Sequence, residues 1–582
     1  MALSAYDWFV IVAYFLFSMG IVWYYRNKGN GGLEDYFVGG RNMPWYLAGL
    51  SMVATTFAAD TPLAVTELVA KDGISGNWLW WNMLIGGMLT AFFFAKLWRR
   101  AGVVTEPELI ELRYHGQPAA FLRGFKAIYL GLFMNVLVIG WVNLAMLGLL
   151  QVFFGLNYSD ALMYVGIIML FTAIYSSISG LWGIAATDAA QFVIAMTGCI
   201  ILAFIVINQP EIGGLVGLQQ KLPASALHFF PQFGQADGQG TLSITIGAFA
   251  AFAGVQWWAS WYPGAEPGGG GYIVQRMLSA KSENDAFKAT LFFQVAHFCL
   301  RPWPWIIVAL CCTILYPNIS EPRLGYVFAM RDFLPSGLKG LLLVAFFAAY
   351  MSTISTQLNW GASYLVNDLY KRFFIKSDLN EARKMVAAGR IFTLVIMFIA
   401  LYATTLMNSI ADVWKFLIEC GAGLGLVLIL RWYWWRINVW SEIVATISPF
   451  LFYFWFRYLG NSGYFPAWFE AQNITYFLTV GCTTIAWLVA TFITKPEPHA
   501  HLAAFYLQVK PGGFWKNFKT EENNKPLMWT VFSWLLAVTF TYSCLFLSGK
   551  ILFGETNEIV MYAVIAAVSL LLLQSCMKRS SV

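Results

Sequence analysis

The chain has 582 residues, of which 59% are hydrophobic and only 11% charged, and its formal net charge is +6. A soluble domain would carry about 25% charged residues, so this composition excludes an ordinary water-soluble protein. The small positive charge is explained by membrane topology and requires no nucleic-acid partner.

Apolar runs long enough to cross a bilayer, which takes roughly 20 residues, recur along the chain. They predict an all-α polytopic membrane protein with about fifteen transmembrane helices. The predicted segments are residues 6–25, 45–70, 76–98, 124–154, 158–179, 182–208, 242–262, 288–316, 337–370, 385–407, 409–430, 440–460, 472–494, 527–548 and 556–577.

The first run follows MALSA without a basic stretch or a small-residue cleavage site, so we expect a retained helix rather than a signal peptide. With the N-terminus outside, most of the 36 lysines and arginines fall in loops on the opposite side. By the positive-inside rule that side is the cytoplasm, and the C-terminus lies there too. We expect a multi-pass protein of the plasma (inner) membrane. Its partners are the lipid bilayer and a small-molecule substrate, and its oligomeric state is open, a monomer included.

Segment 45–70 has polar residues and a proline in its middle. Asp60 is costly to bury in lipid, and Pro62 forbids a continuous backbone hydrogen-bond ladder. Segment 242–262 runs into SWYPGAEPGGGGY, whose prolines and glycines cannot continue a helix. Both segments are therefore predicted to be interrupted.

The two interrupted segments begin two successive groups of five, residues 45–208 and 242–430. Interrupted helices at matching positions of two halves predict an inverted repeat with a binding site between the halves. Carbonyls freed at a break are tolerated where they line a cavity or bind an ion. The alternative interpretation is a pair of kinks at which neighbouring helices supply the missing hydrogen bonds.

A polar stripe follows the apolar run GLKGLLLVAFFA. Ser352, Ser355, Thr356 and Asn359 are spaced so that they share one helical face, and Thr353 widens it. In lipid such a face must turn inward, where hydroxyls either join helices by hydrogen bonds or bind an ion. Hydroxyls and broken-helix carbonyls suit Na⁺, a hard cation that prefers oxygen ligands. From these residues alone, the two interpretations are equal.

Five stretches carry a family resemblance: VGGRNMPWYLAGLSMVATTFAAD, GVVTEPELIELRY, GIAATDAAQFVIAMTG, YIVQRMLSAKSENDAFKA and AAYMSTISTQLNWGASYLVNDLYKRF. They resemble the sodium:solute symporters, a family that includes sodium/galactose, sodium/proline and sodium/sialic acid transporters. The resemblance covers about residues 6–437. It implies an inverted five-helix repeat of the leucine-transporter type, with one extra N-terminal helix (6–25) and about four extra C-terminal helices (440–577). It also implies alternating access driven by Na⁺ as the co-transported ion.

The resemblance implies two sets of sodium ligands. The main site would use the carbonyls of Ala54, Phe57 and Ala349 and the hydroxyls of Ser352 and Thr353. Some members bind a second sodium, whose ligands would be Asp188, Ser355 and Thr356. The alternative for Asp188 is a capped, water-accessible residue near the inner end of its helix.

The resemblance also places the substrate contacts and the gates. The substrate contacts would be Thr61 with Asp60 before it, Trp80, Asn82 and His297, and the inner and outer gates Tyr262 and Trp414. The family's sugar-binding lysine and glutamine become His297 and Ile418 here, and the PGAEPGGGG linker is about three residues longer than the family pattern, which argues against galactose itself.

Further polar and aromatic residues lie near the breaks. Arg301 and Lys415, both in apolar runs, could bind a substrate carboxylate. Alternatively, Arg301 pairs with Asp60 or Glu419, and Lys415 pairs with Glu419. Trp258 and Trp261 are either stacking residues of the binding site or packing residues.

Together these patterns predict a secondary active transporter that couples inward sodium flux to uptake of a small polar organic solute. A sugar-like solute is slightly favoured, with an amino acid or organic carboxylate as alternatives. A transporter-like solute sensor is the alternative from another class, but it would need a signalling domain larger than the loop 495–526. Catalysis is not expected, since we find no nucleophile–base pair and only five histidines.

Overall fold

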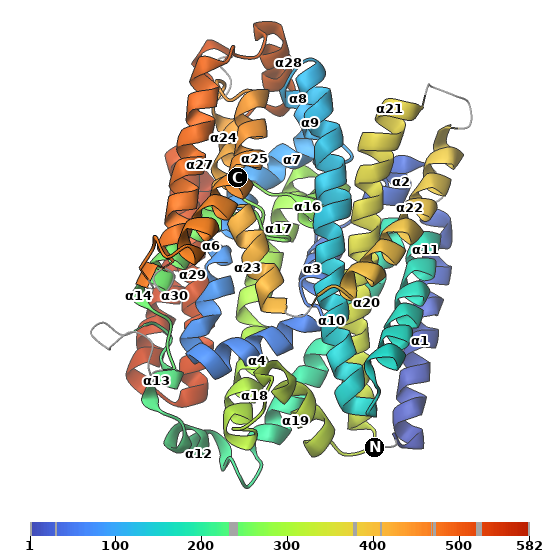
Figure 1. Ribbon diagram of the computed structural model, residues 1–582, viewed down its shortest axis with the longest axis vertical. Coiled ribbons are helices and arrows are strands. Elements are labelled where there is room, and N and C mark those ends of the chain that lie inside the picture. Colours follow the sequence, from blue (N-terminus) through green and yellow to red (C-terminus); the bar gives the residue numbers. More distant parts are fainter. Residues whose placement is uncertain are drawn as a thin grey trace.

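The computed structural model describes residues 3–29, 32–231, 242–375, 381–407, 410–466, 468–469, 473–518 and 527–579. In these ranges the chain is almost entirely helical, and the long helices run roughly along the long axis of the molecule (Figure 1). Eleven helices of the described part are long and apolar enough to cross a membrane, and shorter apolar helices at Trp45–Thr55 and Ile246–Ala259 add to them.

The first predicted repeat corresponds to a broken helix followed by three long helical stretches, the last of which bends in its middle. The main elements are α3 (Trp45–Thr55), α4 (Asp60–Asp72), α5 (Trp78–Trp81), α6 (Met83–Leu89), α7 (Ala95–Ala101), α8 (Glu108–Arg113), α9 (Gln117–Ile128), α10 (Asn135–Phe154) and α11 (Tyr158–Ile207).

The second predicted repeat has the same plan. Its elements are α14 (Ile246–Ala250), α15 (Trp257–Ala259), α16 (Gly271–Ser279), α17 (Glu283–Cys299), α18 (Pro302–Leu315), α19 (Gly325–Phe333), α20 (Leu338–Tyr364), α21 (Arg372–Phe374), α22 (Glu381–Thr404), α23 (Ile410–Cys420) and α24 (Gly425–Tyr433). The short helices α12 (Gly214–Lys221) and α13 (Ala224–Leu227) precede it.

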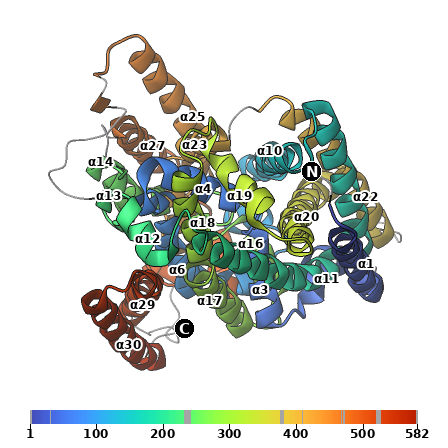
Figure 2. The same ribbon diagram turned by 90° about the horizontal axis from the view of Figure 1, so that it is seen from below.

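The helices outside the two predicted repeats are α1 (Ala5–Tyr25), α2 (Leu33–Val38), α25 (Val439–Asn461), α27 (Ile474–Ile493), α28 (His499–Val509), α29 (Leu527–Phe553) and α30 (Thr556–Arg579). Figure 2 shows α29 and α30 together at one edge of the bundle and α1 beside α11 and α20 at another. These helices cover the sides of the core and contribute no residue to the cavity described below.

The predicted segments 158–179 and 182–208 lie in one stretch, α11, that leaves helical geometry only at Gly180, with φ 59° and ψ −158°. A side chain there would also collide with the Tyr36 backbone, since a Cβ would lie 2.8 Å from its carbonyl oxygen. Glycine is required for both reasons, and it marks the corner between the two predicted segments.

Both predicted helix breaks are present. The α-helical ladder stops at residues 56–59, and Pro62 lies in the first turn of α4. Proline is tolerated there because the first N–H groups of a helix have no partner within the helix. The second break spans residues 260–270, where Gly264, Gly268 and Gly269 have φ values of 85°, 78° and 81°.

The segment 288–316, predicted as a single helix, is also interrupted. α17 ends at Cys299 and α18 begins at Pro302, so Arg301 lies at the junction of two helices. Pro302 and Pro304 cannot donate backbone hydrogen bonds to the preceding turn, which explains the new helix start. The junction directs the Arg301 side chain toward the first break.

α20 lies at the centre of the bundle. In the most apolar 18-residue window of the span that contains it, Leu338–Phe374, 94% of the residues are buried, a larger share than in the other described spans. α20 packs against α1, α3, α11 and α22. Its polar stripe therefore faces protein and not lipid, as predicted. This position brings the hydroxyls of α20 to the first break.

The N-terminus of α20 is capped by α1. The buried carboxylate of Asp7 accepts hydrogen bonds from the backbone N–H groups of Gly337 and Gly340, at 2.8 and 2.6 Å. Its other oxygen accepts from the backbone N–H and hydroxyl of Ser4. A carboxylate at this end also complements the helix dipole.

Asp7→Ala is expected to destabilise the protein by about 2 kcal/mol, because two N–H groups of the α20 terminus, one of them buried, lose their acceptor. Asp7→Asn keeps one acceptor oxygen and should therefore lose less stability than Asp7→Ala. Thermal unfolding of both variants in detergent checks this. Equal melting temperatures for Asp7→Ala and the wild type would contradict the cap.

Candidate functional site

The first break leaves backbone carbonyls free at the end of α3, and side chains from two sides donate hydrogen bonds to them. On one side, the Thr353 hydroxyl of α20 donates a hydrogen bond to the Thr55 carbonyl at 2.8 Å. On the other side, Arg301 Nη2 donates to the Thr56 carbonyl at 2.6 Å. Carbonyls at a helix end need such partners when water is excluded, so both contacts stabilise the interruption.

The residues predicted for the main sodium site lie on the two elements that meet here. They are Ala54 and Phe57 at the break and Ala349, Ser352 and Thr353 on α20, and all five are buried. Ser352 donates to Asp188 Oδ1 at 2.6 Å, so its hydroxyl also points into the bundle. The oxygen-only donor set fits Na⁺, which would bind as cargo and not as a resident cofactor.

The residues predicted for the second sodium site are only partly together. Asp188 accepts hydrogen bonds from Ser51 and Ser352, and Arg276 Nη2 lies 3.6 Å from its carboxylate. Thr356 accepts from the same Arg276 nitrogen at 2.6 Å.

The remaining member of that set, Ser355, turns to its own helix and donates to the Ser352 carbonyl. Arg276 is therefore the cation beside Asp188 in this conformation. The motif YIVQRML contains Arg276, but no local pattern indicated this contact.

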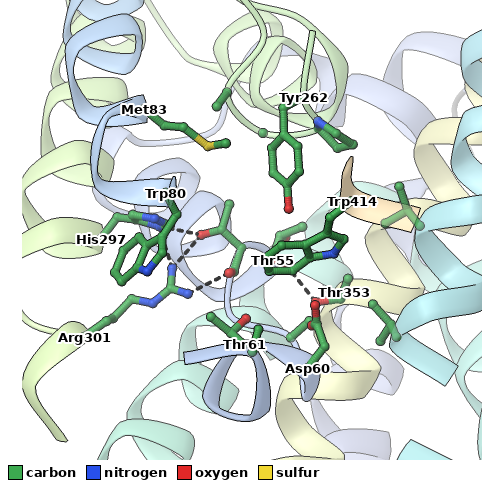
Figure 3. A pocket seen from close by; sticks show the side chains of 18 of the residues that line it. Thr55, Asp60, Thr61, Trp80, Met83, Tyr262, His297, Arg301, Thr353 and Trp414 are labelled. Carbon is green, nitrogen blue, oxygen red and sulfur yellow. Dashed lines mark hydrogen bonds between the residues drawn. The ribbon is translucent and has the colours of Figure 1, made fainter. Parts of the chain in front are cut away.

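A cavity lies between the two breaks, and most of the predicted substrate contacts line it. The volume in which the centre of a water molecule fits is about 120 Å³. A single water needs roughly 10–15 Å³ on this definition, so the cavity has room for several. The predicted residues that line it are Asp60, Thr61, Trp80, His297 and Arg301, with both gates, Tyr262 and Trp414. Figure 3 shows Arg301, His297 and Trp80 on one side of the cavity and Asp60, Thr353 and Trp414 on the other.

The two predicted gates touch each other. The rings of Tyr262 and Trp414 meet edge to face, with centroids 6.0 Å apart. Trp141 of α10 makes a similar contact with Trp414, at 6.1 Å. An aromatic wall thus joins the second break to α23 and α10.

Three predicted substrate contacts do not line the cavity. The Asn82 amide donates to the carbonyls of Trp78 and Leu79 at 2.8 Å, so it is used within its own helix. Trp258 likewise donates to the Gly254 carbonyl, and Trp261 is buried against Gly421. Lys415 lies outside the residues whose side chains the structure describes.

Arg301 does not form the predicted ion pairs. Within the described residues, no carboxylate oxygen lies within 4 Å of Arg301, so neither Asp60 nor Glu419 is its partner. Its guanidinium is fully buried and lies over the rings of Phe57 and Trp305, 5.3 and 5.0 Å from their centroids.

Several cavity residues were not predicted, among them Met83, Trp141, Tyr272, Gln294 and Gln357. Three of them could have been found from helical spacing, because Gln357 lies four residues after Thr353, Gln294 three before His297 and Met83 three after Trp80. Trp141 and Tyr272 come from helices without a predicted substrate contact and carry no local signal.

Four lining residues have a buried polar atom without a hydrogen-bond partner within the described structure. These atoms are Asp60 Oδ1, Gln357 Oε1, Trp414 Nε1 and Arg301 Nε. Buried polar groups are normally paired, so two acceptors and two donors around one cavity indicate a ligand that supplies the complement.

Comparison with known proteins agrees with this geometry. The model of the sodium:solute symporter family matches residues 36–447. The sodium/glucose cotransporter of Vibrio parahaemolyticus is 25% identical over 488 residues, which cover 78% of this chain and 86% of that protein. The human sodium/glucose cotransporter 4 is 23% identical, with 70% of this chain covered and 61% of that protein.

Among solved structures, the substrate-bound, outward-open structure of a Na⁺-coupled sialic acid symporter has the same fold. Its TM-score is 0.66 at 18% identity, and the match covers 85% of this chain and 99% of that one. The inverted-repeat architecture predicted from the interrupted helices is thereby confirmed.

Proposed function

Because the chain belongs to the sodium:solute symporter family and is a sodium-coupled solute symporter, we propose that its solute is a small, polar, sugar-like molecule held between the two helix breaks. The observation that carries this proposal is the set of partnerless polar atoms in an aromatic-walled cavity. A polyhydroxyl solute supplies both donors and acceptors, and its apolar faces stack on aromatic rings. The relatives named as sodium/glucose cotransporters support the same class.

In the proposed cycle Na⁺ binds first, between the carbonyls of Ala54, Phe57 and Ala349 and the hydroxyls of Ser352 and Thr353. It thereby orders the first break and completes the cavity between the two breaks. Because each ligand favours the same conformation, sodium and solute raise each other's affinity to an equal degree. Asp188, Thr356 and Ser355 form a second sodium site only if Arg276 withdraws from the carboxylate.

The solute is then held by side chains from both repeats. Asp60 and Thr61 contact it from α4. Trp80 contacts it from α5, and His297 contacts it from α17. Trp414 closes over it from the outside and Tyr262 moves to release it inside. No covalent chemistry is involved.

The orientation follows from charge. We place the N-terminus outside and the C-terminus in the cytoplasm, because the basic residues of α7, α8 and α9 gather at the end of the molecule where α28 also lies (Figure 1). The membrane is then the plasma membrane, and inward sodium flux drives solute uptake.

Uptake into proteoliposomes tests the function. With a panel of radiolabelled monosaccharides, we expect accumulation under an inward sodium gradient and none when choline replaces sodium at constant pH. Accumulation of a sugar in choline would overturn sodium coupling. Sodium-dependent accumulation of amino acids but of no sugar would overturn the solute class alone.

A further inference from the structure

Arg301 is a buried cation bound to uncharged oxygen atoms. Its Nη1 donates to the Thr56 hydroxyl at 2.8 Å and to the Val53 carbonyl at 3.4 Å, and its Nη2 donates to the Thr56 carbonyl at 2.6 Å. A buried charge of this kind costs several kcal/mol unless it is compensated. Compensation comes here from the C-terminal end of α3, whose free carbonyls carry partial negative charge.

The oxygens bound by Arg301 differ from those proposed to bind sodium. Arg301 takes the carbonyls of Val53 and Thr56, whereas the proposed sodium site takes those of Ala54 and Phe57. The Thr55 carbonyl between them is bonded by Thr353 of α20. At the end of α3, the Thr55 carbonyl is therefore bonded by α20, and the Val53 and Thr56 carbonyls are bonded by Arg301.

We propose that Arg301 is a tethered cation that permanently occupies the side of the first break away from α20 and thereby prepares the side facing α20 to bind Na⁺. This inference rests on the proposed function, because it takes the break to be the sodium site. Arg301 is then a positioning residue. It orders part of the break before sodium arrives, so that sodium binding needs to order only the remainder.

The same guanidinium orients a residue of the cavity wall. Arg301 Nη1 lies 2.6 Å from His297 Nδ1. A guanidinium has only donors, so Nδ1 accepts the hydrogen bond, and the ring proton of the neutral imidazole is on Nε2. His297 lines the cavity, so it presents a hydrogen-bond donor to the solute. Arg301 thus determines which kind of solute atom His297 recognises, namely an acceptor such as a hydroxyl oxygen.

The test uses purified full-length protein in detergent, with Na⁺ and guanidinium ion as probes and thermal unfolding as the readout. For Arg301→Ala we expect the sodium concentration that gives half of the maximal stabilisation to rise about tenfold, because charge-assisted hydrogen bonds to the break are lost. Millimolar guanidinium chloride should fill the vacated position, stabilise Arg301→Ala and restore its sodium response. It should not stabilise the wild type.

Two further variants separate charge from packing. Arg301→Gln has similar bulk without charge and should behave like Arg301→Ala toward sodium. Arg301→Lys keeps a cation beside the carbonyls and should stay closer to the wild type. If Arg301→Ala does not fold, these two variants decide the question. Equal sodium responses of Arg301→Gln and Arg301→Lys would overturn the proposal. It would also be overturned if guanidinium did not stabilise Arg301→Ala.

Arg99→Ala is the matched control, because Arg99 also donates to a backbone carbonyl, that of Ala280, but away from the break. Its sodium response should equal that of the wild type. The two proposals fail differently. If sodium does not stabilise the wild type against thermal unfolding, the proposed sodium site is contradicted. Stabilisation of Arg301→Ala by guanidinium is measured without sodium, so it tests only the proposed role of Arg301.

Discussion

Thr353→Val is expected to abolish sodium-driven uptake. Valine has nearly the same shape, but it removes both a proposed sodium ligand and the donor to the Thr55 carbonyl across the break. A hard cation gains nothing from a methyl group, so the affinity for Na⁺ should fall by about a hundredfold. Sodium titrations followed by thermal unfolding, and uptake into proteoliposomes, measure the two effects.

Thr290→Val is the control for this change. Thr290 is equally buried, but its hydroxyl donates to the Ala286 carbonyl within its own helix, α17. The control should keep the wild-type sodium midpoint. If Thr353→Val also keeps it, then the hydroxyls of α20 join helices and do not bind sodium.

Asp60→Asn is expected to remove solute binding while sodium binding persists. Asp60 is 3% exposed, lines the cavity, and has a carboxylate oxygen without a hydrogen-bond partner within the described structure. A hydrogen bond from the solute to a buried carboxylate is worth about 1.5–3 kcal/mol, so the solute affinity should fall by roughly 10- to 150-fold. Sugars, amino acids and organic acids that stabilise the wild type in sodium should lose their effect on this variant.

Asp72→Asn provides the comparison, because Asp72 lies at the far end of the same helix and does not line the cavity. Its solute response should be unchanged. If Asp60→Asn instead loses its sodium response, Asp60 belongs to the sodium site. If it keeps its solute response, the solute binds elsewhere.

The interrupted helices were predictable because proline and glycine act locally on the backbone. Pro62 by itself does not locate the first break, since it is compatible with the first turn of α4 and residues 56–59 contain neither proline nor glycine. The inward orientation of the α20 stripe was also predictable, because hydroxyls on one face of a helix in lipid must find partners. A local rule sufficed in each successful case.

Contacts between distant residues were beyond local rules. Arg276 binds at Asp188 and Thr356 through the packing of three helices, and nothing near it in sequence indicates those partners. Arg301 was recognised as anomalous, yet its acceptors are carbonyls, which every residue has and no sequence pattern distinguishes. Asn82 does not line the cavity, and its amide N–H groups find acceptors one turn away.

The Asp7 cap has a mechanical consequence. It fastens α1 to the end of α20, and both helices pack on α11. α3, which ends at the first break, packs on α17 as well as on α11 and α20. The proposed sodium ligands come from α20 and from the first break, so an ion bound there would link α20 to α3. When the ion departs, we expect α3 to become free to slide along α20.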